Sequence, residues 1–156
     1  MANYKFNFFL SYAHENKEGV MKMLSHLTQA GLTVWQDTEE MKQGSIDEHM
    51  MNGIRNSQVF VACVSTQYEG SENCMKEFNY AIANKNDIVF VLFEKIKGEK
   101  ERMDQLGVIG FHMARKHFYK PENVGQIKKA IQDLLIVSFI TFITNLIFDK
   151  LTNLTS

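Results

Sequence analysis

The sequence predicts an α/β fold, a flavodoxin-like doubly wound sheet of five parallel strands in the order 2-1-3-4-5, flanked by helices. Segments with the composition of strands alternate along the chain with segments of helical periodicity. Most of the strand-like runs are continuously apolar, which is typical of a parallel sheet covered on both faces. With 156 residues, of which 45% are hydrophobic, the chain can bury the core of one compact domain.

The first half of the chain supplies two strands and two helices. Residues 6–12 form the first predicted strand, and the next helix carries apolar side chains at helical spacing until Gly31 ends it. Residues 33–36 form the second strand, and the polar run 37–45 is expected to be a loop. The following helix carries Ile46, Met50 and Ile54 on one side.

The third and fourth strands are the apolar runs 59–64 and 88–93. Between them, residues 65–71 are expected to be a loop that leads into another helix. The apolar face of that helix consists of Cys74, Phe78, Ala81 and Ile82.

The remainder of the domain is less regular in sequence. Residues 94–107 are charged and aperiodic, which predicts a surface loop with a short helix around 100–106. A short last strand is expected within 110–119, where irregular apolar spacing leaves the register open. Pro121 then marks the start of the final helix.

Charge and cysteine content exclude several classes of protein. Lys and Arg number 17 against 18 for Asp and Glu, so no basic excess points to nucleic acid. Cys63 and Cys74 form no CxxC pair and have no His at ligand spacing, so neither a metal site nor a disulfide framework is predicted. The N-terminal residues lack the apolar segment of a secretion signal, and we therefore expect a cytoplasmic protein.

Glu77 is the residue that points most directly to a function. Helical periodicity places it beside Cys74 and Ala81 of the apolar face, so that it borders the core. Ser71 is a good N-cap residue, and Glu77 would then lie within the first two turns, where negative charge is favoured. The alternative is a solvated carboxylate at the margin of the apolar face.

Ligands of doubly wound sheets bind outside the carboxyl ends of the strands, here at the switch point between strands one and three. This rule selects the loops at 11–16 and 65–71, and the second of these leads directly to Glu77. The turn Ser11-Tyr12-Ala13-His14 has no glycine to approach a pyrophosphate, and the chain contains no P-loop. Ser65 stands where a phospho-receiver domain would need an aspartate. Nucleotide hydrolysis and two-component signalling are therefore disfavoured.

Four short motifs occur in register along the chain. They are Phe9-Leu10-Ser11-Tyr12, then Gly31 with Val34, Trp35 and Asp37, then Gly44 with Ile46, and last Ser65 with Ser71, Cys74 and Glu77. Together they resemble the TIR (Toll/interleukin-1 receptor) domain, from about Tyr4 to about Leu135. The resemblance implies a TIR domain over residues 1–135, followed by an apolar C-terminal helical extension over 136–156.

The resemblance also implies a reaction. In TIR domains that cleave NAD⁺, the glutamate of the S-x-x-C-x-x-E stretch is catalytic, and Glu77 holds that position here. One carboxylate suffices, because nicotinamide is already cationic and leaves as a neutral ring, so that positive charge develops on the ribose. Attack by water gives ADP-ribose, whereas attack by the substrate's own adenine gives a cyclic product. NAD⁺ is thus the expected substrate, and no cofactor is expected.

Two other functions remain open. One is a non-catalytic TIR scaffold that acts through homotypic contacts between TIR domains. The other is a nucleoside-processing transferase on the same type of sheet, which can also use one glutamate at a ribosyl carbon.

The resemblance further implies a set of substrate-binding residues. They are Ser11, Tyr12, His14, Trp35, Asp37, Gly44, Ser71 and Cys74. Trp35 can stack on a substrate ring or belong to the core, whereas Ser71 and Cys74 also suit an N-cap and core packing. NAD⁺-cleaving members commonly form head-to-tail assemblies in which the loop equivalent to 37–45 completes a neighbour's site. Self-association is therefore expected.

The C-terminal segment Leu134–Phe148 is apolar apart from Ser138, Thr141, Thr144 and Asn145. It is about 15 residues long, against the roughly 20 that a membrane-spanning helix needs. This length favours a helix that binds a partner or a second copy, over packing on its own domain and over membrane contact.

Overall fold

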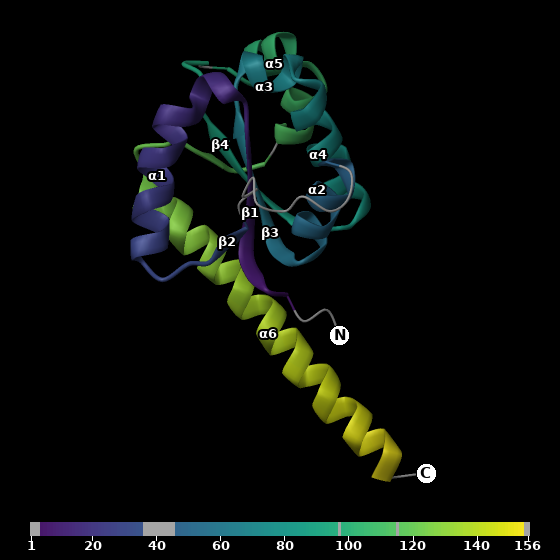
Figure 1. Cartoon of the computed structure of the whole chain (residues 1–156). Helices are drawn as coiled ribbons and strands as arrows, with labels where there is room; N and C mark the ends of the chain where they lie inside the picture. The colour runs from purple at the N-terminus through teal and green to yellow at the C-terminus, as the bar shows by residue number, and fades with distance from the viewer. Residues whose placement is uncertain (1–3, 36–45, 97, 115, 155–156) are drawn as a thin grey trace.

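The computed structural model describes residues 4–35, 46–96, 98–114 and 116–154 (Figure 1). All of its strands are parallel, and they form one sheet in the order β2-β1-β3-β4-β5. Helices cover both faces of this sheet in the described part of the chain. The predicted fold class is therefore confirmed.

The strands differ in length because they differ in position. The long inner strands are β1 (Phe6–Tyr12), β3 (Ser57–Val64) and β4 (Asp87–Leu92). The edge strands β2 (Val34–Trp35) and β5 (Phe118–Tyr119) contain two residues each. Every residue of β3 except Gln58 is buried, as expected for a strand that is paired on both sides and covered on both faces.

Two groups of helices build the two halves of the core. On one face lie α1 (Lys17–Gln29) and the first turns of α6 (Val124–Leu154) (Figure 1). The other face carries α2 (Ile46–Arg55), α3 (Thr66–Gly70), α4 (Glu72–Ala83) and α5 (Glu99–Met113). A 3₁₀ turn, η1 (His14–Asn16), joins β1 to α1.

Two helical segments differ from the prediction. Residues 65–71, predicted to be a loop, contain α3, which begins where the Ser65 hydroxyl accepts a hydrogen bond from the Tyr68 backbone N–H at 3.1 Å. α5 extends to Met113, well beyond the short helix predicted at 100–106, and it kinks at Gly107, where φ is 49°. The kink breaks the helical periodicity, and this is why the second half of α5 escaped the sequence pattern.

The strand boundaries shift by smaller amounts. β3 begins at Ser57 rather than at residue 59, and β4 runs one residue earlier than predicted. β5 pairs with β4 through Phe118 opposite Phe90. That pairing fixes the register that the sequence left open.

The last helix serves both the domain and the extension. Ile127 and Ile131 of α6 are fully buried against the sheet, and Leu134 and Leu135 are the last residues that pack on this cluster. Beyond them the helix continues unbroken to Leu154 and projects away from the domain (Figure 1). The alternative in which this segment packs on its own domain is therefore wrong for the described structure.

Candidate active site

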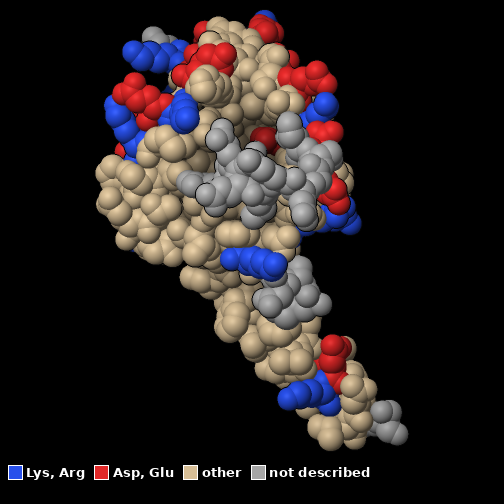
Figure 2. Space-filling view, in the orientation of Figure 1, with Lys and Arg blue, Asp and Glu red and all other residues tan. Residues whose placement is uncertain are grey.

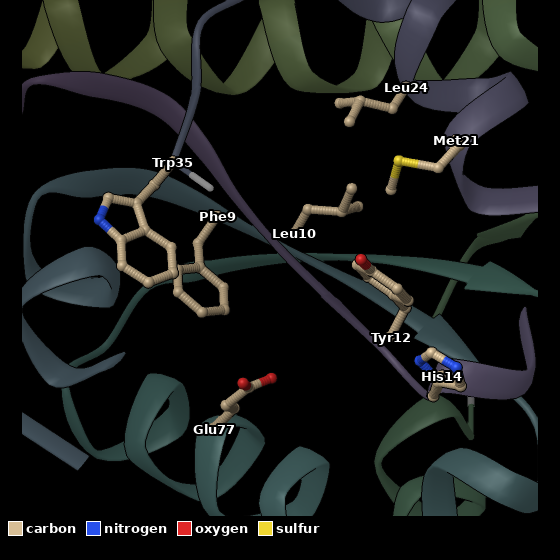
Figure 3. Close-up of a pocket in the computed structure, with 8 residues that line it drawn as sticks. All are labelled: Phe9, Leu10, Tyr12, His14, Met21, Leu24, Trp35 and Glu77. Atoms are coloured by element: carbon tan, nitrogen blue, oxygen red, sulfur yellow. The ribbon is translucent and has the colours of Figure 1, made fainter. Parts of the chain in front are cut away.

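The candidate site lies along β1, where the short strand β2 stops. Phe9 opposite Trp35 is the last pair between these strands, and β1 continues to Tyr12 without a strand neighbour on that side among the described residues. A cavity of about 380 Å³ opens there, within the roughly 300–1,000 Å³ of small-molecule sites (Figure 3). Its described lining consists of Phe9, Leu10, Tyr12, His14, Met21, Leu24, Trp35 and Glu77.

α4 carries Glu77 into this cavity. The helix begins at Ser71, whose hydroxyl accepts a hydrogen bond from the Cys74 backbone N–H at 3.3 Å, as predicted for an N-cap. Burial of Cys74 and Phe78 fixes the rotation of the helix. Glu77 is consequently half-buried, and its carboxylate points toward the space that the other labelled side chains surround (Figure 3).

Two buried hydroxyls orient the Glu77 carboxylate. The Ser11 hydroxyl, at the end of β1, donates a short hydrogen bond to Glu77 Oε2. Ser11 Oγ also lies 2.7 Å from the Tyr68 hydroxyl. Burial raises the pKa of Tyr68 well above its usual value, so its hydroxyl stays protonated, and because the Ser11 hydrogen is directed to Glu77, the Tyr68 hydroxyl donates the hydrogen bond to Ser11 Oγ. The proton order is therefore Tyr68 to Ser11 to Glu77.

Tyr68 is the residue of this hydrogen-bond network that the sequence analysis did not identify. It lies on α3, in the segment predicted to be a loop, and it is completely buried. The available signal was its position three residues after Ser65, the spacing at which a serine caps a helix.

The loops that follow β1 and β3 meet, as the switch-point rule predicts. The Ser65 hydroxyl donates a hydrogen bond to Asn16 Oδ1 at 2.7 Å and accepts one from the Tyr68 backbone. This contact ties η1 to the start of α3. The same hydrogen bonds connect the turn after β1, which follows Ser11, to the helix that carries Tyr68.

Tyr12 and His14 contribute polar groups to the lining of the cavity. Tyr12 is half-buried, and its pKa is raised chiefly by burial and further by Cys63 and Glu77. Its hydroxyl is therefore a neutral hydrogen-bond donor in the cavity that Glu77 also lines. His14 is exposed and lines the same cavity.

Trp35 forms a rigid wall of the cavity. Its ring stacks on Phe9 with centroids 4.9 Å apart, and Phe9 stacks in turn on Phe60 at 5.5 Å. Gly53 of α2 lies so close to the indole that a Cβ there would come within 2.5 Å of it. The ring is thus held by the protein itself, and stacking on a substrate stays a prediction.

Ser71 and Cys74, two of the other predicted residues, are absent from the described cavity lining. Ser71 caps α4, and Cys74 is 4% exposed in the core, where burial raises its thiol pKa to about 11. A thiol with such a pKa is not a nucleophile at neutral pH. Asp37 and Gly44 lie outside the described residues. Among the described residues, no group of three or more His, Cys, Asp or Glu side chains is arranged to hold a metal ion.

Comparison with known proteins identifies the family. A family model described as TIR domain matches residues 8–127. The chain belongs to the TIR domain family. No curated protein sequence matches it.

Solved structures of TIR proteins share the fold. The TIR domain of the Toll-related receptor TRR-2 from Hydra magnipapillata matches with a TM-score of 0.64 and 15% identity, covering 83% of this chain and 98% of that one. A metazoan TIR-STING receptor from C. gigas matches with a TM-score of 0.63 and 18% identity, covering 84% of this chain and 41% of the receptor. The TIR domains of the activated Roq1 resistosome, which recognises the pathogen effector XopQ, match with a TM-score of 0.53 and 21% identity, covering 83% of each chain. At these identities the similarity concerns the fold.

Proposed function

We propose that this TIR domain cleaves the bond between nicotinamide and ribose in NAD⁺, with Glu77 as the catalytic residue. The observation that carries the proposal is the Glu77 carboxylate, half-buried in a cavity of about 380 Å³ and oriented by the buried Ser11 hydroxyl. A fixed carboxylate beside a developing cation stabilises the transition state without reorganising during the reaction.

The chemistry needs one such group. As the glycosidic bond breaks, its electron pair goes to the nicotinamide nitrogen, the ring leaves uncharged, and positive charge develops on the ribose next to Glu77. Water then attacks the ribosyl carbon and loses a proton, which gives ADP-ribose. Attack by the adenine of the same substrate would give a cyclic product instead.

The cavity walls suit a substrate of this kind. Trp35 and Phe9 form an aromatic side, whereas Leu10, Met21 and Leu24 form an aliphatic side. An apolar enclosure strengthens the attraction between a carboxylate and a cation, because it removes water from between them. Tyr12 and His14 in the lining supply polar groups for contacts to the ribose or the phosphates.

We also propose that the domain acts as an assembly of copies in the cytoplasm. The proposal rests on the resemblance to NAD⁺-cleaving TIR domains, in which the loop equivalent to residues 37–45 completes the site of a neighbour. Association would then populate the competent state by mass action, and activity per protomer should rise with protein concentration.

The test is incubation of the purified chain with NAD⁺ over a dilution series, with nicotinamide and the second product measured by chromatography. Glu77→Gln keeps the shape of the side chain and removes its charge, and we expect turnover to fall on the order of 100-fold or more. The matched control is Glu72→Gln. Glu72 lies on the same helix, exposed and paired with Lys76 at 2.9 Å, so the control should keep parental turnover.

Each outcome has a clear meaning. Turnover that is lost only in Glu77→Gln supports the proposal, provided that thermal unfolding of both variants stays cooperative. Equal turnover in the parent and Glu77→Gln would refute the catalytic role. A parent without turnover at any concentration would instead favour a non-catalytic scaffold.

A further inference from the structure

The projecting half of α6 carries apolar side chains that nothing in the described structure covers. Ile127 and Ile131 are fully buried at the start of the helix, whereas most of the apolar side chains beyond Leu135 are between 42% and 82% exposed, and Phe142 and Ile143 are half-buried. These exposed residues are Ile136, Val137, Phe139, Ile140, Leu146, Ile147, Phe148, Leu151 and Leu154. A surface this apolar requires an apolar environment in the functional protein.

The exposed residues surround the helix rather than forming one stripe. The side chains of Ser138, Thr141, Asn145 and Asp149 recur at spacings of three and four, so they share an arc of about 80° at 3.6 residues per turn. Apolar side chains occupy most of the remaining circumference. A helix that docks on one soluble partner would have a polar face opposite the contact, and a helix lying on a membrane surface would have a wide charged face. The polar arc of this helix is narrow and contains one charged residue, Asp149, so the helix matches neither case.

Two polar side chains of the projecting helix are satisfied within the helix itself. The hydroxyls of Thr141 and Thr144 donate to the carbonyls of Val137 and Ile140, each at 2.9 Å. These two hydroxyls and the helical backbone groups therefore need no water as a hydrogen-bond partner. Internal satisfaction of hydrogen bonds is the requirement that a bilayer interior imposes on a protein segment.

We propose that residues 136–154 form a membrane anchor that spans a lipid bilayer. The described helix Val124–Leu154 contains an 18-residue window with a mean hydropathy of 1.9. The uncharged run alone is short, but the structure extends the helix without a break to Leu154. From Ile136 to Leu154 it is about 28 Å long at 1.5 Å per residue, close to the roughly 30 Å thickness of the hydrocarbon layer.

Charged residues mark both ends of this anchor. Lys129 and Asp133 pair at 2.6 Å just before it, and Lys116 lines a cavity together with Leu134 at the point where the helix leaves the domain. Asp149 and Lys150 lie within about 8 Å of the far end, where charged side chains can extend to the interface. Figure 2 shows the same order on the face in view, since charged side chains are scattered over the domain and appear again near the end of the projecting helix. The anchor is independent of the activity proposed for Glu77.

The test is flotation of the full chain, exchanged from mild detergent into phosphatidylcholine vesicles with and without phosphatidylglycerol. We expect the parent to float with both kinds of vesicle and to resist extraction by alkaline carbonate. Ile143→Lys places a charge near the middle of the span, and it should reduce vesicle partitioning on the order of 100-fold. Leu151→Lys is the matched control, because its charge lies beside Lys150 near the interface, and it should partition like the parent within about threefold.

Three results would overturn the anchor. Parent protein that stays with the lipid-free fractions, as an oligomer by light scattering, would assign the helix to contacts between copies. Release of the parent by salt or carbonate would assign it to the membrane surface. Equal flotation of Ile143→Lys and the parent would show that the segment does not enter the hydrocarbon. Cooperative thermal unfolding of each variant checks that the domain is intact.

Discussion

Substitution of Tyr68 by phenylalanine tests the hydrogen-bond chain that orients Glu77. The variant keeps the buried ring and removes one hydroxyl, which lies 2.7 Å from Ser11 Oγ. Ser11 keeps its proton for Glu77 but loses the partner that fixes the orientation of its hydroxyl. The change therefore acts on the position of the carboxylate without touching the cavity.

The magnitudes follow from the burial of these groups. Loss of one buried hydrogen bond should lower the free energy of unfolding of Tyr68→Phe by about 1 kcal/mol. If the orientation of Glu77 weakens by a similar free energy, kcat for NAD⁺ cleavage falls by about tenfold while KM changes little. Ser11→Ala should be worse in both respects, because it removes the bond to Glu77 and leaves the Tyr68 hydroxyl buried without a partner.

A double-mutant cycle gives the sharpest assay. In the parent, Tyr68→Phe should be destabilising, whereas in the Ser11→Ala background it should be neutral or stabilising, because it removes the unsatisfied hydroxyl. In that background it should also leave kcat unchanged within about twofold. Urea unfolding and nicotinamide release measure the two effects separately. The matched control is Tyr4→Phe, at a tyrosine that is 42% exposed.

Strictly additive effects of Tyr68→Phe and Ser11→Ala on the free energy of unfolding would refute the hydrogen bond between these two side chains. Additive effects on kcat, with coupled effects on stability, would show that the chain stabilises the fold without positioning Glu77. Either result can be read from the same four proteins.

Two further predictions concern the walls of the site. Gly53→Ala should lower stability by about 1–3 kcal/mol and change the emission of Trp35, the single tryptophan, because the new Cβ would lie 2.5 Å from the indole. Gly70→Ala, where nothing lies within 4 Å of the added Cβ, is the control, and equal behaviour of the two variants would contradict the packing argument. For Cys74, burial raises the thiol pKa from 9.0 to about 11, so between these pH values the unfolded chain loses a proton that the folded protein keeps. Parental stability should therefore fall from pH 9 to 11, and less so in Cys74→Ala, whereas parallel stability curves would argue against this source of the loss.

The sheet could be predicted from the sequence because its signals are local. A strand buried on both faces must be apolar at every position, and the run at β3 satisfies that condition independently of its neighbours. The order 2-1-3-4-5 is a common arrangement for such an alternation of strands and helices, and the switch-point rule then located the ligand site. The edge strand β5 could not be placed from local sequence signals, because two residues carry no periodicity and only the pairing of Phe118 with Phe90 defines the strand.

The site was predictable in part for the same reason. The position of Glu77 follows from the cap at Ser71 and from the apolar face of α4, both of which are encoded within a few residues. The partners of Glu77 are not encoded in this way. Ser11 and Tyr68 are 66 and 9 residues away in sequence, and only the packing of α3 and α4 beside β1 brings their hydroxyls together.

The sequence by itself determined the fold class and the helix that presents Glu77, because short-range periodicity and capping specify them, and four short motifs in register carried the family resemblance. The tertiary structure decided how Glu77 is held, which predicted residues share its cavity, and that the end of α6 has no cover in the described part of the chain. These features depend on side chains that are distant in sequence, or on the absence of a neighbour. Neither a long-range contact nor an uncovered face leaves a periodic signal in the chain, so both emerge only when the elements are packed.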